Sequence, residues 1–267
     1  MSDVVYLYGF VPADAPAPPA TLRGVEDRPV ELLALGDVAA VIAHVPATEY
    51  QAERVNARMD DLGWLAERGI AHERVVAWLV DQGDVLPAGL LTLFSSVAAL
   101  RADAGPRAPT LRAQLARLYG AREWDLKVAW ERARLEAHAG AVSPEIRALD
   151  DEIAAAAPGR RFLLEKKRAD LLRRELGQAA RRAAGELFDR LREHARDAVT
   201  RAAPRADVEL PVVLAAALLV ERGREAALQD ACAEERGALE PLGFTVELTG
   251  PWAPYRFLEP HPDVDAA

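Results

Sequence analysis

The segment from Arg160 to Ala203 contains no proline, and its length limits the folds that this chain can adopt. Its leucines keep to one side of a helix, at positions 163, 164, 171, 172, 176, 187 and 191. At about 1.5 Å per residue, a continuous helix here is about 60 Å long. A domain of about 145 residues has a radius of gyration of about 15 Å and cannot enclose it. The helix must therefore protrude, pair with another helix, or bend near Gly177 or Gly185.

A second helix is predicted immediately before this one. Ser143, Pro144 and Glu145 supply an N-cap, a first-turn proline and a first-turn acid, and Pro158-Gly159 ends that helix near residue 156. We expect the two helices to form an antiparallel hairpin, inserted at about residues 143–203.

The rest of the second half predicts a small sheet. Large apolar residues alternate with smaller or polar ones over 123–130, as in a half-buried strand: Trp124, Leu126, Val128 and Trp130. Strands follow at 208–210, 212–220 and 243–248, with a helix over 222–242 before the last strand. With the helical hairpin as first crossover, the order is β-α-β-β-α-β, that of a modified ferredoxin-like domain.

The first half predicts a mixed α/β layer domain. Strands are expected at 4–10, 30–35 and 38–45, the last two joined by the turn formers Gly36-Asp37, and a bent strand at 85–94. Helical periodicity covers 51–82, where Met59 and Leu62 belong to the recurring apolar positions, and shorter helices are expected before and after the Gly105–Pro109 cluster. The fold class is therefore α+β with two domains, 1–119 and 120–267.

Composition excludes several classes of protein. The net charge of −9 argues against nucleic acid as the main partner, because phosphate binding depends on clustered Lys and Arg. The single cysteine, Cys232, permits no internal disulfide, and the apolar run from Pro211 to Val220 is too short to span a membrane. The N-terminus lacks the features of a secretory signal, so we expect a cytoplasmic protein.

The sequence contains few signals of an enzyme. It contains no P-loop, no G-x-G-x-x-G after a strand, no G-x-S-x-G and no H-E-x-x-H, so we expect no catalytic residues, no cofactor and no metal. His72 and Glu73 could form an acid/base pair. The simpler interpretation makes them polar positions on the helix face away from Val75, Val76 and Leu79.

A basic stretch suggests a second possible function, the binding of an acidic partner or of nucleic acid. Residues 160–182 contain nine basic residues and three acids, a local net charge of +6. The basic doublets recur about every seven residues, so they fall near one helix face. They indicate either a solvated helix with internal ion pairs, an acidic protein partner, or nucleic acid.

The C-terminal clamp, Leu248 to Phe257, has two prolines and three aromatic rings. Such a segment is neither helix nor central strand, so it should lie across a surface and pack there. We expect Trp252 to be buried, and Trp252→Ala then to cost about 3 to 5 kcal/mol.

Five segments resemble the GvpL/GvpF family of gas vesicle accessory proteins. They are Tyr6–Phe10, Leu86–Phe94, Glu123–Val128, Arg161–Lys167 and Leu248–Phe257, and they run from one end of the chain to the other.

The family's central motif usually reads Leu-Pro-Leu-Arg-Phe-Gly-Thr. This chain has Ala88-Gly89-Leu90-Leu91 after Leu86-Pro87, so the motif's arginine and following glycine are absent. A role that depends on that arginine is not expected here.

The resemblance implies a non-enzymatic role in building gas vesicles. Its partners would be the small hydrophobic shell protein and other accessory proteins, with no membrane partner, and the protein would be cytoplasmic and associated with gas vesicles. The candidate interaction or motif residues are Tyr8, Pro87, Phe94, Trp124, Lys127, Arg161, Lys166, Lys167, Arg174, Trp252, Tyr255 and Phe257.

Overall fold

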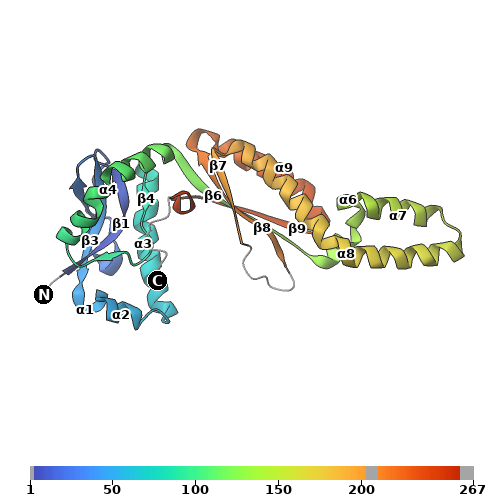
Figure 1. Ribbon diagram of the computed structural model, residues 1–267, viewed down its shortest axis with the longest axis horizontal. Helices are drawn as coiled ribbons and strands as arrows, with labels where there is room; N and C mark the ends of the chain where they lie inside the picture. Colours follow the sequence, from blue (N-terminus) through green and yellow to red (C-terminus); the bar gives the residue numbers. More distant parts are fainter. Residues whose placement is uncertain (1–2, 203–209, 259–267) are drawn as a thin grey trace. The chain divides into compact units, whose positions relative to one another are not determined.

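The computed structural model describes residues 3–202 and 210–258, which form two compact units (Figure 1). Unit 1 contains the described residues up to Glu123 together with those from Pro251 onward, and unit 2 is Trp124–Gly250. The chain is a mixed α and β protein with one sheet in each unit.

The sheet of unit 1 is built around its first strand. Its strands are β1 (Asp3–Pro12), β2 (Glu31–Leu35), β3 (Val38–Pro46), β4 (Leu86–Pro87) and β5 (Leu93–Phe94). Their order is β2-β3-β1-β4, and β5 also pairs with β1. The predicted turn at Gly36-Asp37 is confirmed, since Gly36 adopts a φ of 78° between β2 and β3. The predicted strand at 85–94 is two short pieces separated by a turn.

The helices of unit 1 pack on this sheet. They are α1 (Ala47–Tyr50), α2 (Ala52–Asn56), α3 (Leu62–Gln82) and α4 (Val97–Leu118), besides the short turns η1 (Val25–Asp27) and η5 (Tyr255–Phe257). The expected break in the Gly105–Pro109 cluster was wrong, because α4 continues through Pro106 and Pro109. Buried Leu100 and Leu111 hold the helix on both sides of the prolines, so tertiary packing outweighs their helix-breaking tendency.

The sheet of unit 2 has the order β7-β8-β6-β9. Its strands are β6 (Ala121–Trp130), β7 (Asp197–Arg201), β8 (Val212–Glu221) and β9 (Phe244–Trp252). The prediction that the long helix reaches residue 203 was wrong at its end, because 197–201 pair antiparallel with β8. The strand predicted at 208–210 falls mostly outside the described residues.

Unit 2 contains the predicted helical hairpin. Its helices are α5 (Arg132–Ala137), α6 (Ala139–Val142), α7 (Pro144–Ala155), α8 (Pro158–Leu191) and α9 (Glu225–Leu239), with the short turns η2 (Arg192–His194), η3 (Arg222–Arg224) and η4 (Glu240–Leu242). Ser143 caps α7 by accepting from the amide of Ile146 at 3.4 Å. The end of α7 at Ala155 confirms the predicted end near residue 156, and Pro158 is the first residue of α8, two residues before the predicted start at Arg160.

The hairpin itself is confirmed, because Asp150 of α7 pairs with Arg168 of α8. Figure 1 shows α7 beside the N-terminal half of α8. The C-terminal half of α8 packs on the core of the unit through Leu176, Leu187 and Leu191.

The two units differ from the predicted division into 1–119 and 120–267. The C-terminal residues from Pro251 onward group with unit 1 rather than unit 2. Ala253 lies in the buried core of unit 1, and Tyr255 packs against it. The apolar contacts of this short tail, not its position in the chain, decide where it belongs.

Candidate functional site

Two of the segments singled out in the sequence, Tyr6–Phe10 and Leu86–Phe94, meet on β1 in unit 1. Pro87 pairs with Gly9, and Phe94 pairs with Val5. Tyr8 is fully buried, and its hydroxyl accepts a hydrogen bond from the amide of Val25 at 2.8 Å. Burial raises the pKa of Tyr8 to about 12. Tyr8 therefore stabilises the unit from inside and offers no surface to a partner.

A buried histidine links β1 to the central motif. The hydroxyl of Tyr6 lies 3.0 Å from Nδ1 of His72, and Nε2 of His72 lies 3.1 Å from the carbonyl oxygen of Ala88. A neutral imidazole satisfies both contacts when Nδ1 accepts from Tyr6 and Nε2–H donates to Ala88. Burial lowers the pKa of His72 to about 4. The sequence interpretation of His72 as an outward polar position was wrong, because the side chain is 1% exposed.

The C-terminal clamp closes over this histidine. Tyr255 donates a hydrogen bond to Oε1 of Glu73 at 2.9 Å, and its hydroxyl lies 3.4 Å from Nε2 of His72. The amide of Arg256 donates to Oε2 of Glu123 at 2.9 Å, and Phe257 is 4% exposed. Burial and the neighbouring carboxylate of Glu73 raise the pKa of Tyr255. The tail is thus fixed to unit 1 by both polar and apolar contacts.

The expected burial of Trp252 was wrong. Its side chain is 47% exposed, whereas Ala253 and Phe257 are buried. In an extended segment successive side chains point to opposite faces, so burial of Ala253 turns its neighbour outward.

In the turn between β4 and β5, Leu91 adopts a backbone conformation that favours glycine. Leu91, which stands where the related motif has its glycine, has a φ of 62°. Its amide donates to the hydroxyl of Tyr6 at 3.0 Å, and the amide of Thr92 donates to the carbonyl of Gly89 at 3.2 Å. These bonds hold Leu91 in the left-handed region, where a side chain costs free energy.

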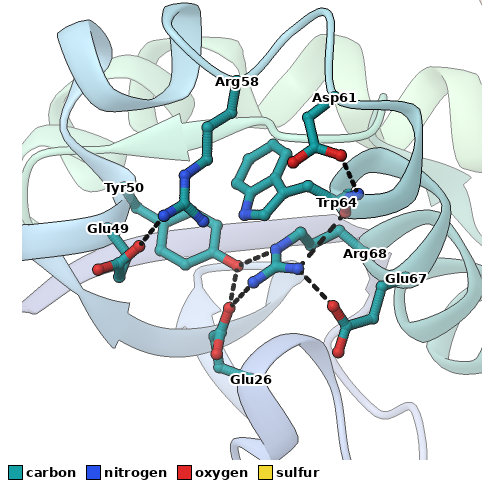
Figure 2. Close-up of polar contacts among 8 residues, drawn as sticks. All are labelled: Glu26, Glu49, Tyr50, Arg58, Asp61, Trp64, Glu67 and Arg68. Carbon is teal, nitrogen blue, oxygen red and sulfur yellow. Dashed lines mark hydrogen bonds and ion pairs between the residues drawn. The ribbon is translucent and has the colours of Figure 1, made fainter.

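A polar network fixes the start of α3, as Figure 2 shows. The side chain of Asp61 caps the helix by accepting from the amide of Trp64 at 3.0 Å. The guanidinium of Arg68 lies 4.6 Å from the Trp64 ring centroid, donates to the Tyr50 hydroxyl at 3.2 Å, and forms an ion pair with Glu26. The face of α3 that carries Trp64 and Arg68 is therefore held against the body of unit 1.

The opposite face of α3 presents apolar side chains to solvent. Leu62, Ala66 and Ile70 follow one another at four-residue intervals, and Leu62 and Ile70 are 79% and 65% exposed. Met59 and Leu90 are also exposed, and a Cβ placed at Gly69 would lie 4.0 Å from Cδ2 of Leu90. We call Met59, Leu62, Ile70 and Leu90 the apolar row.

The apolar row corrects the interpretation of the helical periodicity. Met59 and Leu62 were counted among the recurring apolar positions of one helical pattern, and both are exposed. Periodicity alone cannot distinguish two apolar faces of one helix. The signal that could have separated them is the pair Asp61 and Arg68, which marks the anchored side.

The remaining candidate residues lie in unit 2. Trp124 is buried and donates from Nε1 to Glu225 at 3.3 Å, and Lys127 pairs with Glu247 at 3.1 Å. Four candidates on α8 are exposed: Arg161, Lys166, Lys167 and Arg174. Both groups belong to unit 2, whereas the residues gathered on β1 belong to unit 1.

Within residues 3–202 and 210–258, the acidic, histidine and cysteine side chains do not gather into a metal centre. In that part of the chain, no group of three or more His, Cys, Asp or Glu side chains could hold a metal ion. Cys232 is buried, and burial raises the pKa of its thiol. None of the helices described has the length and apolar character needed to cross a bilayer.

Comparison with known proteins decides the family. The sequence profile described as "Gas vesicle synthesis protein GvpL/GvpF" matches residues 4–259. The chain belongs to the GvpL/GvpF family.

This GvpL/GvpF protein has relatives of similar length. It is 34% identical over 254 residues to gas vesicle protein L of a Streptomyces species, covering 90% of this chain and 86% of the relative. It is 28% identical to gas vesicle protein L2 of Halobacterium salinarum, covering 96% and 92% of the two chains. These matches span nearly the whole chain and support a role related to gas vesicles.

Two crystal structures of GvpF share its fold. The structure from an Anabaena species superimposes with a TM-score of 0.69 at 19% identity, covering 97% of this chain and all of the other. The structure from Microcystis aeruginosa gives a TM-score of 0.65 at 19% identity, covering 96% and 99%.

Proposed function

We propose that this GvpL/GvpF protein is a non-enzymatic assembly factor that binds the small hydrophobic gas vesicle shell protein. The apolar row carries the proposal, because Leu62 and Ile70 expose large apolar side chains on the outer face of the anchored helix α3, and Met59 and Leu90 in the neighbouring turns are also exposed. Contiguous exposed apolar surface is uncommon on monomers and marks interaction sites. A shell subunit with a large apolar face aggregates unless it is covered before it joins the wall.

The location and architecture of the protein belong to the same proposal. We place it in the cytoplasm at growing gas vesicles, where it also meets other accessory proteins. The β-α-β-β-α-β succession of unit 2, with its first and third strands at the centre of the sheet, supports a modified ferredoxin-like domain with the α7–α8 hairpin in its first crossover.

Co-elution with the shell protein tests the binding surface. Leu62→Ser/Ile70→Ser should abolish co-elution, since two apolar side chains then no longer cover the shell protein's apolar face. Phe162→Ser/Leu163→Ser is the matched control, because those side chains are 70% and 66% exposed in unit 2. Circular dichroism of each variant reports whether it is folded. Wild-type co-elution by folded Leu62→Ser/Ile70→Ser would remove α3 as the binding surface.

A further inference from the structure

α8 carries basic side chains at seven-residue intervals. They are Arg160, Lys167, Arg174 and Arg181, which we call the cationic row, and all four are exposed. Two helical turns take about 7.2 residues, so these side chains lie almost in line. At about 1.5 Å per residue the row is about 30 Å long.

Most of the cationic row has no carboxylate partner. Arg160 is 3.9 Å from Glu152, at the limit of an ion pair. Among the residues that the structure describes, no carboxylate lies within 4.0 Å of the basic atoms of Lys167, Arg174 or Arg181. The simple interpretation of a helix neutralised by its own ion pairs therefore does not hold for this face.

Neighbouring basic residues on the same helix do form ion pairs. Arg168 pairs with Asp150 of α7, and Arg173 pairs with Asp170. Asp170 is thus already engaged, although it lies between Lys167 and Arg174 on the face of the cationic row. Of the four basic residues on this face, three therefore keep a charge that is unpaired among the described residues.

Two more residues shape this face. Leu163 follows Arg160 by three residues, lies on the same side and is 66% exposed. Gly177 follows Arg174 by three residues, and a Cβ placed there would meet only Nη1 of Arg181, at 3.9 Å. The face therefore offers an apolar contact at one end and room for close approach near the other.

We propose that the cationic row binds an acidic α-helix of a partner protein, with carboxylates at seven-residue intervals and an apolar side chain opposite Leu163. Helices that pack side by side at a shallow angle meet every seven residues, which is the spacing of the row. Complementary charge then fixes the register of the partner helix. This inference goes beyond shell-protein binding and does not depend on it, because it uses a different unit.

Nucleic acid and lipid fit this face less well. The chain carries a net charge of −9, which repels phosphate backbones, and Phe162 is the sole aromatic residue of 160–182. A bilayer surface favours a continuous apolar stripe beside the cations, whereas Leu163 is a single apolar side chain at one end of the row.

Peptide binding to the full-length protein tests the proposal. The probe is a fluorescein-labelled helical peptide of about 28 residues, four heptads, with Glu at every seventh position and one Leu three residues after the first Glu. A peptide of identical composition with irregular Glu spacing measures non-specific attraction. Lys167→Glu/Arg174→Glu should raise the Kd about 10-fold or more, because two exposed attractions become repulsions. Arg54→Glu/Arg74→Glu is the control with the same charge change at exposed positions of unit 1.

Charge reversal in the peptide completes the test. A probe with Lys in place of the regular Glu should bind Lys167→Glu/Arg174→Glu more tightly than wild type. Equal binding of regular and irregular peptides, or equal weakening by the control variant, would overturn the proposal. So would displacement of the regular peptide by an oligothymidine strand or phosphatidylserine vesicles at matched charge. A dimer in sedimentation that Lys167→Glu/Arg174→Glu dissolves would assign the row to a second copy instead.

Discussion

The hydroxyl of Tyr255 donates a hydrogen bond of 2.9 Å to the carboxylate of Glu73, which lies 182 residues earlier in the chain. The same hydroxyl lies 3.4 Å from Nε2 of His72, whose other ring nitrogen contacts Tyr6 on β1. The C-terminal tail is therefore part of the folding unit formed by the N-terminal strands. Truncation of the tail should act on unit 1 rather than on the unit that precedes it in sequence.

Removing this one hydroxyl should have a small, measurable effect. Tyr255→Phe should lower the free energy of unfolding by about 1 kcal/mol, since the ring stays packed and only the hydrogen bonds are lost. Tyr119→Phe, at a tyrosine that is 70% exposed, is the matched control. Chemical denaturation followed by fluorescence measures both, and equal stability of the two variants would contradict a role for the Glu73 contact.

Within the tail, Phe257 should matter more than Trp252. Phe257→Ala removes a ring that is 4% exposed and should cost about 3 to 5 kcal/mol. Trp252→Ala removes a ring that is 47% exposed, and about 1 to 2 kcal/mol is expected from the smaller buried area. Urea unfolding of both variants gives the comparison. A larger loss for Trp252→Ala would show that the tail packs through the other face.

Acid should destabilise unit 1 through His72. The folded-state pKa of about 4 lies below the unfolded value of about 6.5, so the unfolded state binds more protons between these values. The contribution of His72 to the free energy of unfolding is fully present above about pH 6.5 and falls as the pH drops to about 4. Below about pH 4 this group changes the stability no further. The loss is about 3 kcal/mol.

The pH dependence can be assigned with two variants. His72→Gln should lower stability at pH 7 and flatten the decline between pH 6.5 and 4, because glutamine does not titrate. His44→Gln, at a partly exposed imidazole on β3, is the matched control for replacing a histidine outside the buried contacts of His72. An unchanged slope in His72→Gln would locate the titrating group elsewhere.

At position 91, glycine should give a more stable protein than alanine, the reverse of the order in a helix. At an ordinary helical position alanine is more stable than glycine by about 1 kcal/mol. At the φ of 62° of Leu91, Leu91→Gly should instead be more stable than Leu91→Ala by about 1 kcal/mol, since glycine alone adopts this conformation freely. Thermal unfolding of the two variants decides the sign. Alanine ranking above glycine would mean that the turn relaxes in solution.

The sequence by itself determined the local elements whose causes lie within a few residues. Gly36-Asp37 predicted the turn between β2 and β3, Ser143 the start of α7, and the alternation from Trp124 to Trp130 a strand with one buried face. The length of the proline-free segment likewise predicted the helical hairpin, which the pairing of Asp150 with Arg168 confirms. Turn chemistry, capping and periodicity are local, so they can be read before the chain folds.

Only the tertiary structure decided which side chains are buried where the local sequence pattern fits more than one arrangement. Burial against the sheet keeps α4 helical through Pro106 and Pro109. Residues 197–201, predicted as helix, form a strand because they pair with β8. His72 was expected to be exposed and is buried, whereas Trp252 was expected to be buried and is exposed. The contacts that decide this, such as that of Tyr255 with His72, join segments distant in sequence. The apolar row became visible for the same reason. Leu62 and Trp64 are both apolar residues of one helix, and only the network around Arg68 shows which of them faces the body of the unit.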